Sequence, residues 1–374
     1  MDADATTDAP AVRLVEQLLL HAHQTRASDV HLEPRRDGVQ VRWRIDGVLT
    51  DGPRFPGELH GPLLARLKVL AELNLVERRR PQDGQFRLQL EPGPSTTSDG
   101  DDDLDVRLAT MPTIAGERAV LRLAQRGRAR WRLCDLGLPD AIAERLGRIL
   151  HSPSGMVICA GPTGAGKTTT LYAALGELHD GTRHLATIED PVEHVLDGAT
   201  QIQVSETSGL TFSVALRALL RHDPDVVLLG EIRDRETAQV AVQAALSGHL
   251  VLTTLHATDT VAALIRLIDL GVDRYLVAAA VSAVVAQRLL RRVRPDDPRR
   301  FEGRVGTFEL LVTHPTLRAM LTGRASEDDL RLAAVRHGLR PLRCAADDLV
   351  SAGLTTPGEV LRTLSVHDTG VGVA

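Results

Sequence analysis

The chain has 374 residues, of which 43% are hydrophobic and 25% are charged, and its formal net charge is −5 at pH 7. These values are typical of a globular protein long enough to form two domains. The negative charge and an aromatic content of 2% argue against electrostatic attraction to nucleic acid or stacking on its bases. No nucleic-acid partner is therefore expected.

The sequence contains no candidate for a membrane span or a secretion signal. The longest apolar run, 276–286, is interrupted by Ser282 and is shorter than the ~20 residues that cross a bilayer. The first residues, MDADATTDAP, are acidic and lack the apolar core of a signal peptide. We expect a cytoplasmic protein with no transmembrane segment.

The N-terminal part has the pattern of a small α/β domain. Residues 1–10 are predicted to be a disordered leader, and 12–27 have helical periodicity. Further predicted elements are strands at 30–33 and 39–45, a tight turn at Asp46-Gly47, a helix at 63–76, and strands at 85–90, 104–110 and 118–123. The acidic segment 93–103 is predicted to be an exposed loop. We expect a domain over 11–124 and a linker over 125–132.

A different pattern begins near residue 133. Short apolar runs at 156–160, 185–188, 226–229 and 250–254 are separated by helical stretches, as in parallel strands covered on both faces. After about residue 261 the chain is predicted to be wholly helical, with a basic break at 291–304. A second domain over 133–364 and a disordered tail over 365–374 are expected.

The cysteine pattern indicates neither disulfides nor a metal centre. Cys134, Cys159 and Cys344 are widely spaced and form no C-x-x-C pair, so buried and reduced cysteines are expected. The fourteen histidines show no H-E-x-x-H pattern. We expect no structural metal and no zinc site.

A phosphate-binding loop is the strongest signal in the sequence. The stretch GPTGAGKTTT follows an apolar run and precedes a helix-period run with Leu171, Leu175 and Leu178 on one face. In that order, glycine backbone N–H groups can surround phosphates at a helix N-terminus, with lysine on the phosphates and threonine on Mg²⁺. ATP and Mg²⁺ are the expected ligands. The predicted binding residues are Gly161, Pro162, Thr163, Gly164, Ala165, Gly166, Lys167, Thr168 and Thr169.

Three more segments place acidic residues or histidine near the ends of predicted strands. They are TIEDPVEH (187–194), DPDVVLLGEIRD (223–234) and SGHLVLTTLHATD (247–259). An open α/β sheet gathers its ligands at the carboxyl ends of its strands. A glutamate there can orient the attacking water or hold Mg²⁺ through water, and a histidine can contact the γ-phosphate.

Together, these four segments resemble the secretion ATPases of type II secretion and type IV pilus assembly, the GspE/PilB-like group. They match the Walker A, Asp box, Walker B and His box motifs of that family. The segments ASDVHLEP, VRWRIDGVL, PQDG, GERAVLRL and GLTFSVALRALLRHDPD are also similar, so the resemblance covers about 27–362. It implies an α/β fold: a RecA-like P-loop ATPase domain preceded by a smaller PAS-like α/β domain.

The resemblance also implies roles for single residues. Glu193 matches the proposed catalytic base, Glu231 the Walker B glutamate, and His256 a His-box residue. Gly230 stands where other P-loop enzymes place an aspartate. Mg²⁺ coordination would therefore depend on Thr168, Glu231 and water.

An arginine from an adjacent domain or subunit can stabilise the transition state at the γ-phosphoryl group. Arg107 and Arg118 in the N-terminal domain are candidates, as are Arg217 and Arg221, which are four residues apart on one helix face. An ordinary surface or ion-paired arginine is an equally good interpretation of each.

The sequence departs from the family pattern in three places. Gln85 replaces an arginine of the PQDGRF segment, and Arg87 is a candidate substitute. The segment RRVRPDDPRRFE replaces a four-cysteine zinc loop, although GRVGTFELL follows it as in assembly ATPases. The family pattern also begins almost at once, so the usual N-terminal docking domain is expected to be absent.

We therefore expect a homo-hexameric, Mg-dependent ATPase that powers pilin or pseudopilin assembly or type II protein secretion. Its partner would be a polytopic platform protein, at the inner face of the cell membrane. Three alternatives remain open: a pilus-retraction ATPase, a RecA-like DNA translocase, and a nucleotide-gated structural subunit without turnover. The acidic net charge disfavours the translocase, and Glu193 with Glu231 disfavours the non-hydrolysing subunit, which Gln85 keeps open.

Overall fold

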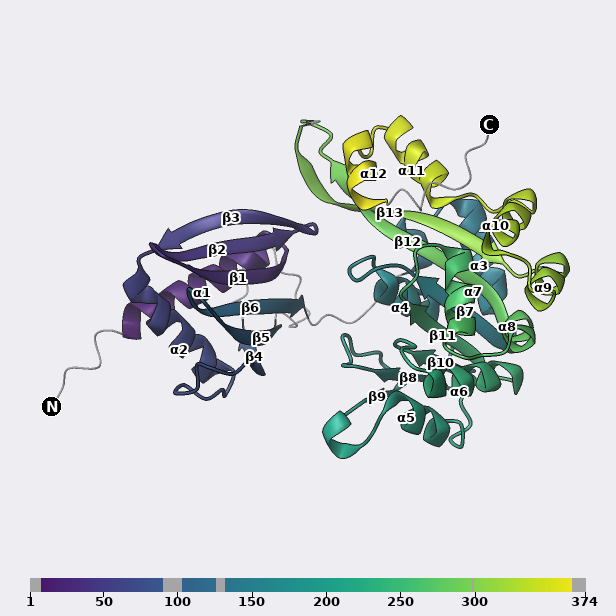
Figure 1. Ribbon diagram of the computed structural model, residues 1–374, viewed down its shortest axis with the longest axis horizontal. Helices are drawn as coiled ribbons and strands as arrows, with labels where there is room; N and C mark the ends of the chain where they lie inside the picture. The colour runs from purple at the N-terminus through teal and green to yellow at the C-terminus, as the bar shows by residue number, and fades with distance from the viewer. Residues whose placement is uncertain (1–7, 90–102, 126–131, 298, 365–374) are drawn as a thin grey trace. The chain divides into compact units, whose positions relative to one another are not determined.

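The computed structural model describes residues 8–89, 103–125, 132–297 and 299–364. The chain divides into two compact units, Met1–Gly127 and Arg128–Ala374 (Figure 1). Most of the predicted leader, acidic loop and linker, and the whole tail, lie outside the described residues.

The first unit is built on a sheet whose six described strands are all antiparallel, in the order β3-β2-β1-β6-β5-β4. Its elements are α1 (Asp8–Gln24), β1 (Ala27–Arg35), β2 (Gly38–Ile45), β3 (Val48–Phe55), α2 (His60–Leu70), β4 (Gln82–Gln89), β5 (Asp103–Thr113) and β6 (Gly116–Gln125). One core joins apolar residues of α1 and α2 to one face of the sheet.

Strand alternation explains the two faces of this sheet. In β1, Val30 and Leu32 are buried in the core, so Asp29, His31 and Glu33 point to the opposite face. Charged residues of the neighbouring strands β2 and β6 share that face and pair with Asp29 and Glu33. The helical core is thus on one side and a charged surface on the other.

Three local predictions in the first unit need correction. Helix α1 begins at Asp8, inside the predicted leader, and Pro10 fits its first turn because a proline there breaks no intrahelical hydrogen bond. Helix α2 ends at Leu70 rather than near residue 76, and Glu72 follows with φ +56°. Strand β3 was not predicted. The Asp46-Gly47 turn is confirmed, with φ of +49° and +81° as a type I′ hairpin requires.

The second unit contains a seven-stranded sheet in the described residues, ordered β13-β12-β7-β11-β10-β8-β9. Its elements are α3 (Asp140–Leu150), β7 (Gly155–Ala160), α4 (Lys167–Leu178), β8 (Leu185–Glu189), β9 (Thr200–Gln203), α5 (Phe212–Leu219), β10 (Val226–Leu229), α6 (Arg235–Leu246), β11 (Leu250–Leu255), α7 (Thr260–Asp269), α8 (Arg274–Ala280), β12 (Val281–Val293), β13 (Phe301–Val312), α9 (Pro315–Thr322), α10 (Glu327–Arg336), α11 (Leu342–Ser351) and α12 (Pro357–Thr363).

Helices cover both faces of this sheet. One core packs α3 and α4 against one face, and a larger core packs α5 to α12 against the other. The four predicted strands become β7, β8, β10 and β11, and their pairing is parallel, as expected. Helices α5, α6 and α7, like α9, α10 and α12, begin at side-chain caps; those of the first three are Thr211, Asp234 and Asp259, each accepting a hydrogen bond from the backbone N–H three residues on.

The prediction of a wholly helical region after residue 261 was wrong. The structure places a long antiparallel hairpin there, β12 and β13, and β12 also pairs in parallel with β7. The apolar run at 276–286 is split between α8 and β12. Because β12 has a strand on each side and helices over both faces, its inner residues are buried without alternation.

Candidate active site

The phosphate loop connects β7 to α4 with a backbone that favours glycine. Gly161, Gly164 and Gly166 have φ of +155°, +76° and +86°. A Cβ on Gly161 would lie 2.8 Å from the Gln287 carbonyl oxygen, and one on Gly166 would lie 2.7 Å from Gln287 Nε2. Gly161 and Gly166 therefore pack tightly on β12, which leaves no room for a side chain at either position.

Lys167 is the first residue of α4 and is 9% exposed, with its side chain directed back to the backbone of the loop. Its Nζ donates hydrogen bonds of 2.8 Å to the carbonyl oxygens of Gly161 and Pro162. Burial lowers the pKa of Lys167, and the nearby Glu231 carboxylate opposes that shift. The loop backbone thus holds the Lys167 ammonium, and the Glu231 carboxylate is close enough to stabilise its charge.

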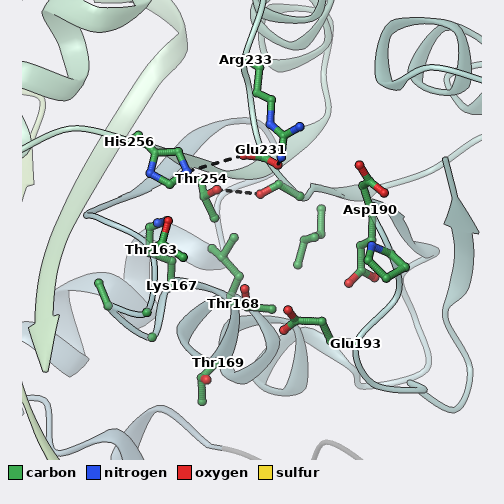
Figure 2. Close-up of a pocket in the computed structure, with 18 of the residues that line it drawn as sticks. Thr163, Lys167, Thr168, Thr169, Asp190, Glu193, Glu231, Arg233, Thr254 and His256 are labelled. Atoms are coloured by element: carbon green, nitrogen blue, oxygen red, sulfur yellow. Dashed lines mark hydrogen bonds and ion pairs between the residues drawn. The ribbon is translucent and has the colours of Figure 1, made fainter. Parts of the chain in front are cut away.

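A cleft of about 440 Å³ lies over the loop (Figure 2). Residues 163–169 line it, and so do Glu193, Glu231 and His256, which come from three separate segments. Gly161 and Pro162 are not among its lining residues. The structure thus brings most of the predicted site residues together in one cavity.

Glu231 lies between a cation and an imidazole in this cleft (Figure 2). One of its oxygens forms an ion pair with Arg233, and Oε2 is 3.6 Å from His256 Nε2. Burial lowers the pKa of His256; the Lys167 charge adds to that shift, and the Glu231 carboxylate opposes it. The neutral imidazole is therefore favoured near neutral pH.

Gly230 occupies a position with little space for a side chain. Its N–H donates to the Ile188 carbonyl at 2.8 Å, and its carbonyl accepts from Thr254 Oγ1 at 2.7 Å. An added Cβ would lie 3.2 Å from the Ile188 oxygen and 3.5 Å from the Glu189 Cα. Close packing of β10 on the end of β8 explains why glycine stands here.

Glu193 is on the segment between β8 and β9. Two strand residues hold that segment: Gln203 Oε1 accepts from Val192 N at 3.3 Å, and Gln201 Nε2 donates to the His194 carbonyl at 2.9 Å. The Glu193 carboxylate is drawn in Figure 2 among the residues that line the cleft. Its place therefore depends on contacts to β9.

Other residues of the cleft were not predicted as site residues. Asp190 and Arg233 line it, and both lie inside motifs that the sequence analysis quoted. Leu289 and Arg304 come from β12 and β13. Leu289 and Arg304 reach the cleft because β12 and β13 form a hairpin, and the prediction of a wholly helical region did not include these strands.

The arginine candidates lie in two different units and have different partners. Arg217 forms an ion pair with Glu236 of α6 and does not line the cleft, while Arg221 donates to the Arg217 carbonyl at 2.8 Å. Arg118, in the first unit, contacts Glu33 Oε1 at 3.1 Å and His31 Nδ1 at 3.0 Å. The ion-paired interpretation thus describes Arg217 and Arg118.

Arg107 lies in a different setting within the first unit. It lines a cavity of about 490 Å³ on the charged face of the sheet, together with Asp29, Gln85 and Arg122. Arg122 Nε is 3.3 Å from Asp29 Oδ1. Arg122 was not predicted as a site residue, although the alternation of β6 places it on this face. Arg87 pairs with Asp105 at 3.3 Å.

The three cysteines are free thiols, as the absence of paired spacing indicated. Cys159 is buried in β7, and burial raises the pKa of its thiol to about 12. Cys134 and Cys344 are exposed, so the expectation that all three are buried was wrong for these two. Within the described residues, no group of three or more His, Cys, Asp or Glu side chains is arranged to hold a metal ion.

The residues of the cleft fit a magnesium-bound nucleotide. Tight glycine turns leave backbone N–H groups at a helix N-terminus, and Lys167 adds a buried cation. The Thr168 hydroxyl and the Glu231 carboxylate supply the oxygen ligands that Mg²⁺ prefers, directly or through water.

A mainly parallel sheet with a phosphate loop at its carboxyl edge and acidic residues in the facing cleft defines a RecA-like P-loop ATPase. Residues 4–362 match the family model described as "Type II/IV secretion system protein". The chain belongs to this family of secretion ATPases. In the part of the chain that the structure describes, no helix combines the length and apolar character of a membrane span.

Similar proteins come from both branches of the family. The type II secretion system protein HxcR of Pseudomonas aeruginosa is 42% identical over 376 residues, covering 96% of this chain and 78% of that protein. The type IV pilus assembly ATPase PilB of Myxococcus xanthus is 36% identical over 396 residues, covering 96% of this chain and 69% of that protein.

Solved structures support the fold. The Yersinia pseudotuberculosis ATPase DotB has a TM-score of 0.76 at 23% identity, covering 94% of this chain and 92% of that one. The pilus retraction motor PilT, solved with bound ADP, has a TM-score of 0.60 at 26% identity, covering 92% and 98%. The α/β fold class, with a RecA-like ATPase domain, is confirmed.

Proposed function

We propose that this chain hydrolyses Mg·ATP in the cleft over the phosphate loop and acts as a motor for pilin or pseudopilin assembly or for type II protein secretion. The observation that carries the proposal is the convergence of Lys167, Glu193, Glu231 and His256 on one cavity, from four segments of the chain. A cleft built only to hold phosphate would not need two carboxylates beside the lysine.

Lys167 would bind the β- and γ-phosphates by turning its Nζ away from the Gly161 and Pro162 carbonyls that accept its hydrogen bonds here. The Thr168 hydroxyl would hold Mg²⁺, with Glu231 acting directly or through water. When bound, the metal would neutralise charge that develops on the phosphate oxygens.

Glu193 is proposed to orient the attacking water and to accept its proton at a carboxylate oxygen. The neutral His256 imidazole would contact the γ-phosphate, and its distance of 3.6 Å from Glu231 would couple the two groups. Arg107 is the strongest candidate for a residue that acts on the nucleotide from an N-terminal domain, because Arg118, the other candidate there, is already ion-paired.

The assembly is proposed by analogy with the family. Six copies would form a ring in the cytoplasm, peripheral to the inner face of the cell membrane. Hydrolysis would drive movements that a polytopic platform protein receives. Relatives named for type II secretion and for pilus assembly both align over most of the chain, which supports this class of task.

Phosphate release by the purified protein with Mg·ATP tests the hydrolytic role. We expect Lys167→Ala to abolish binding of a fluorescent ATP analogue. Glu231→Gln should keep binding but slow turnover by at least ~100-fold, since a positioned carboxylate contributes that much to proton transfer or water orientation. Glu236→Gln, at the surface ion pair with Arg217, is the matched control. Wild-type turnover in Glu231→Gln would contradict the proposed site.

A further inference from the structure

Tyr172 is a buried tyrosine on the helix that follows the phosphate loop. It is 1% exposed and lies four residues after Thr168, on the same face of α4. The hydroxyl of a buried tyrosine usually has a hydrogen-bond partner. Here the partners belong to the segment that carries Glu193.

The Tyr172 hydroxyl connects α4 to Glu189, the last residue of β8, and to His194, which follows Glu193. It donates to Glu189 Oε2 at 2.6 Å, and its oxygen accepts from the His194 backbone N–H at 3.4 Å. The His194 carbonyl is 3.1 Å from the same hydroxyl. The tyrosine ring meets the His194 imidazole edge-on, with centroids 5.6 Å apart and planes at 82°. Tyr172 thus holds the residue next to Glu193 by its backbone and its side chain.

Glu189 and Gln201 complete a buried polar bridge. The second Glu189 oxygen accepts from Thr187 Oγ1 at 2.7 Å and from Gln201 Nε2 at 3.4 Å. Gln201 also donates to the His194 carbonyl at 2.9 Å and accepts from Leu196 N at 2.7 Å. The segment around Glu193 is therefore fixed from α4 on one side and from β9 on the other.

We propose that Tyr172 is a positioning residue for hydrolysis: its hydroxyl, with Glu189 and Gln201, fixes the segment that carries Glu193 at a set place relative to the phosphate loop. The inference rests on the proposed function, because it assigns Tyr172 an effect only through Glu193. The bridge begins one helical turn after Thr168.

The electrostatics agree with a lasting bridge. Burial raises the pKa of Tyr172, and the Glu189 carboxylate and, to a smaller extent, Glu193 raise it further. The hydroxyl therefore stays protonated and remains a donor across the working pH range. Glu189, which is 4% exposed, needs that donor because a buried carboxylate with a missing hydrogen bond is costly.

Tyr172→Phe tests the proposal because it removes the hydroxyl and keeps the ring. We expect kcat to fall about 10- to 100-fold, the size of loss that a small misplacement of a reacting group causes, with the affinity for a fluorescent ATP analogue unchanged within about twofold. Tyr275→Phe, at an exposed tyrosine of α8, is the matched control and should keep wild-type turnover.

A double-mutant cycle with Glu193→Gln separates positioning from general packing. Single-turnover phosphate release resolves the slow rates. If Tyr172 acts through Glu193, Tyr172→Phe should cause no further loss in the Glu193→Gln background. Losses that multiply in the double variant, or full turnover in Tyr172→Phe, would overturn the inference.

The outcome also distinguishes this inference from the proposed function. Wild-type turnover in Glu193→Gln alone would refute the role of Glu193, and this inference would then fail with it. A slow Glu193→Gln combined with a fully active Tyr172→Phe would refute the positioning role alone. Should Tyr172→Phe fail to fold, Gln201→Met removes the opposite side of the bridge, and the same non-additivity with Glu193→Gln is expected.

Discussion

His256 Nε2 lies 3.6 Å from Glu231 Oε2, and the other oxygen of the same carboxylate is paired with Arg233. The Glu231 carboxylate therefore faces His256, whose charge changes with pH, and Arg233, which stays positively charged. Burial, and then the charge of Lys167, lower the pKa of His256, and protonation of His256 would add a further cation beside that lysine. This relationship makes the site sensitive to acid.

We expect His256 to contribute to the pH dependence of stability. Its pKa in the folded protein is below the ordinary value of 6.5, so the folded state binds fewer protons than the unfolded state. The contribution is present above pH 6.5 and is lost as the pH falls through the lowered pKa. Between about pH 7 and pH 5, the Tm of His256→Gln should fall less than that of the wild type. Parallel slopes would contradict this, and the exposed His151→Gln serves as control.

Gly230→Asp should damage the protein rather than restore a missing metal ligand. The new Cβ would lie 3.2 Å from the Ile188 carbonyl, so β8 or β10 must shift, at a cost of about 1–3 kcal/mol. We expect a lower Tm and no gain in ATP turnover. Gly147→Asp on α3, where a Cβ meets open space, controls for the added charge. Faster hydrolysis by Gly230→Asp would refute the steric explanation.

Two glycines of the phosphate loop form a matched pair. Both have positive φ, but a Cβ on Gly164 meets open space and one on Gly161 lies 2.8 Å from a backbone carbonyl. Gly164→Ala should cost about 1 kcal/mol from the backbone conformation alone. Gly161→Ala should cost about 1–3 kcal/mol more, because the β12 backbone has to move. Thermal unfolding of the two variants measures the difference, and equal losses would contradict the contact.

Glu359 should stabilise the second unit except in strong acid. Its carboxylate accepts from Arg291 Nη2 at 2.5 Å and from two Arg362 nitrogens at 2.8 and 2.9 Å. Burial alone would raise the pKa of Glu359, but hydrogen bonds from Arg362 and Arg291 lower it to about 2. This stabilisation is complete above the ordinary value of 4.5 and is lost as the pH falls toward 2.

Glu359→Gln tests that expectation. At pH 7 it should lose about 1.5–3 kcal/mol of stability, the range for hydrogen bonds to a charged group. The gap in Tm between variant and wild type should close in acid. Asp296→Asn removes a surface ion pair with Arg294 and should change Tm little. A gap that persists at the lowest pH would show that packing, not the charge, accounts for the loss.

The sequence was most informative where local chemistry determines structure. The phosphate loop, the four parallel strands and the Asp46-Gly47 turn each follow from short patterns. It failed at β12, because an alanine- and valine-rich run of this length is compatible with a helix or with a buried strand. What decides for a strand is pairing with β7 and β13, and the β7 partners are more than a hundred residues away in the chain.

The same distinction holds for the site. Glu193, Glu231 and His256 could be predicted to meet, because parallel strands end at one edge of the sheet. The ion pair of Arg217 with Glu236 could not be predicted, since it depends on how α5 packs against α6. The contact of Tyr172 with Glu189 depends likewise on the tertiary placement of α4 over β8.

Cys159 gives the second unit an internal reporter of opening. Its thiol is enclosed in the central part of the sheet, two residues before the phosphate loop begins at Gly161, whereas Cys134 and Cys344 face solvent. A thiol-specific dye should therefore react quickly with two sulfurs per chain and reach the third only when β7 separates from its neighbours. Slowing of that last step by added nucleotide would report ligand occupancy with no label attached beforehand.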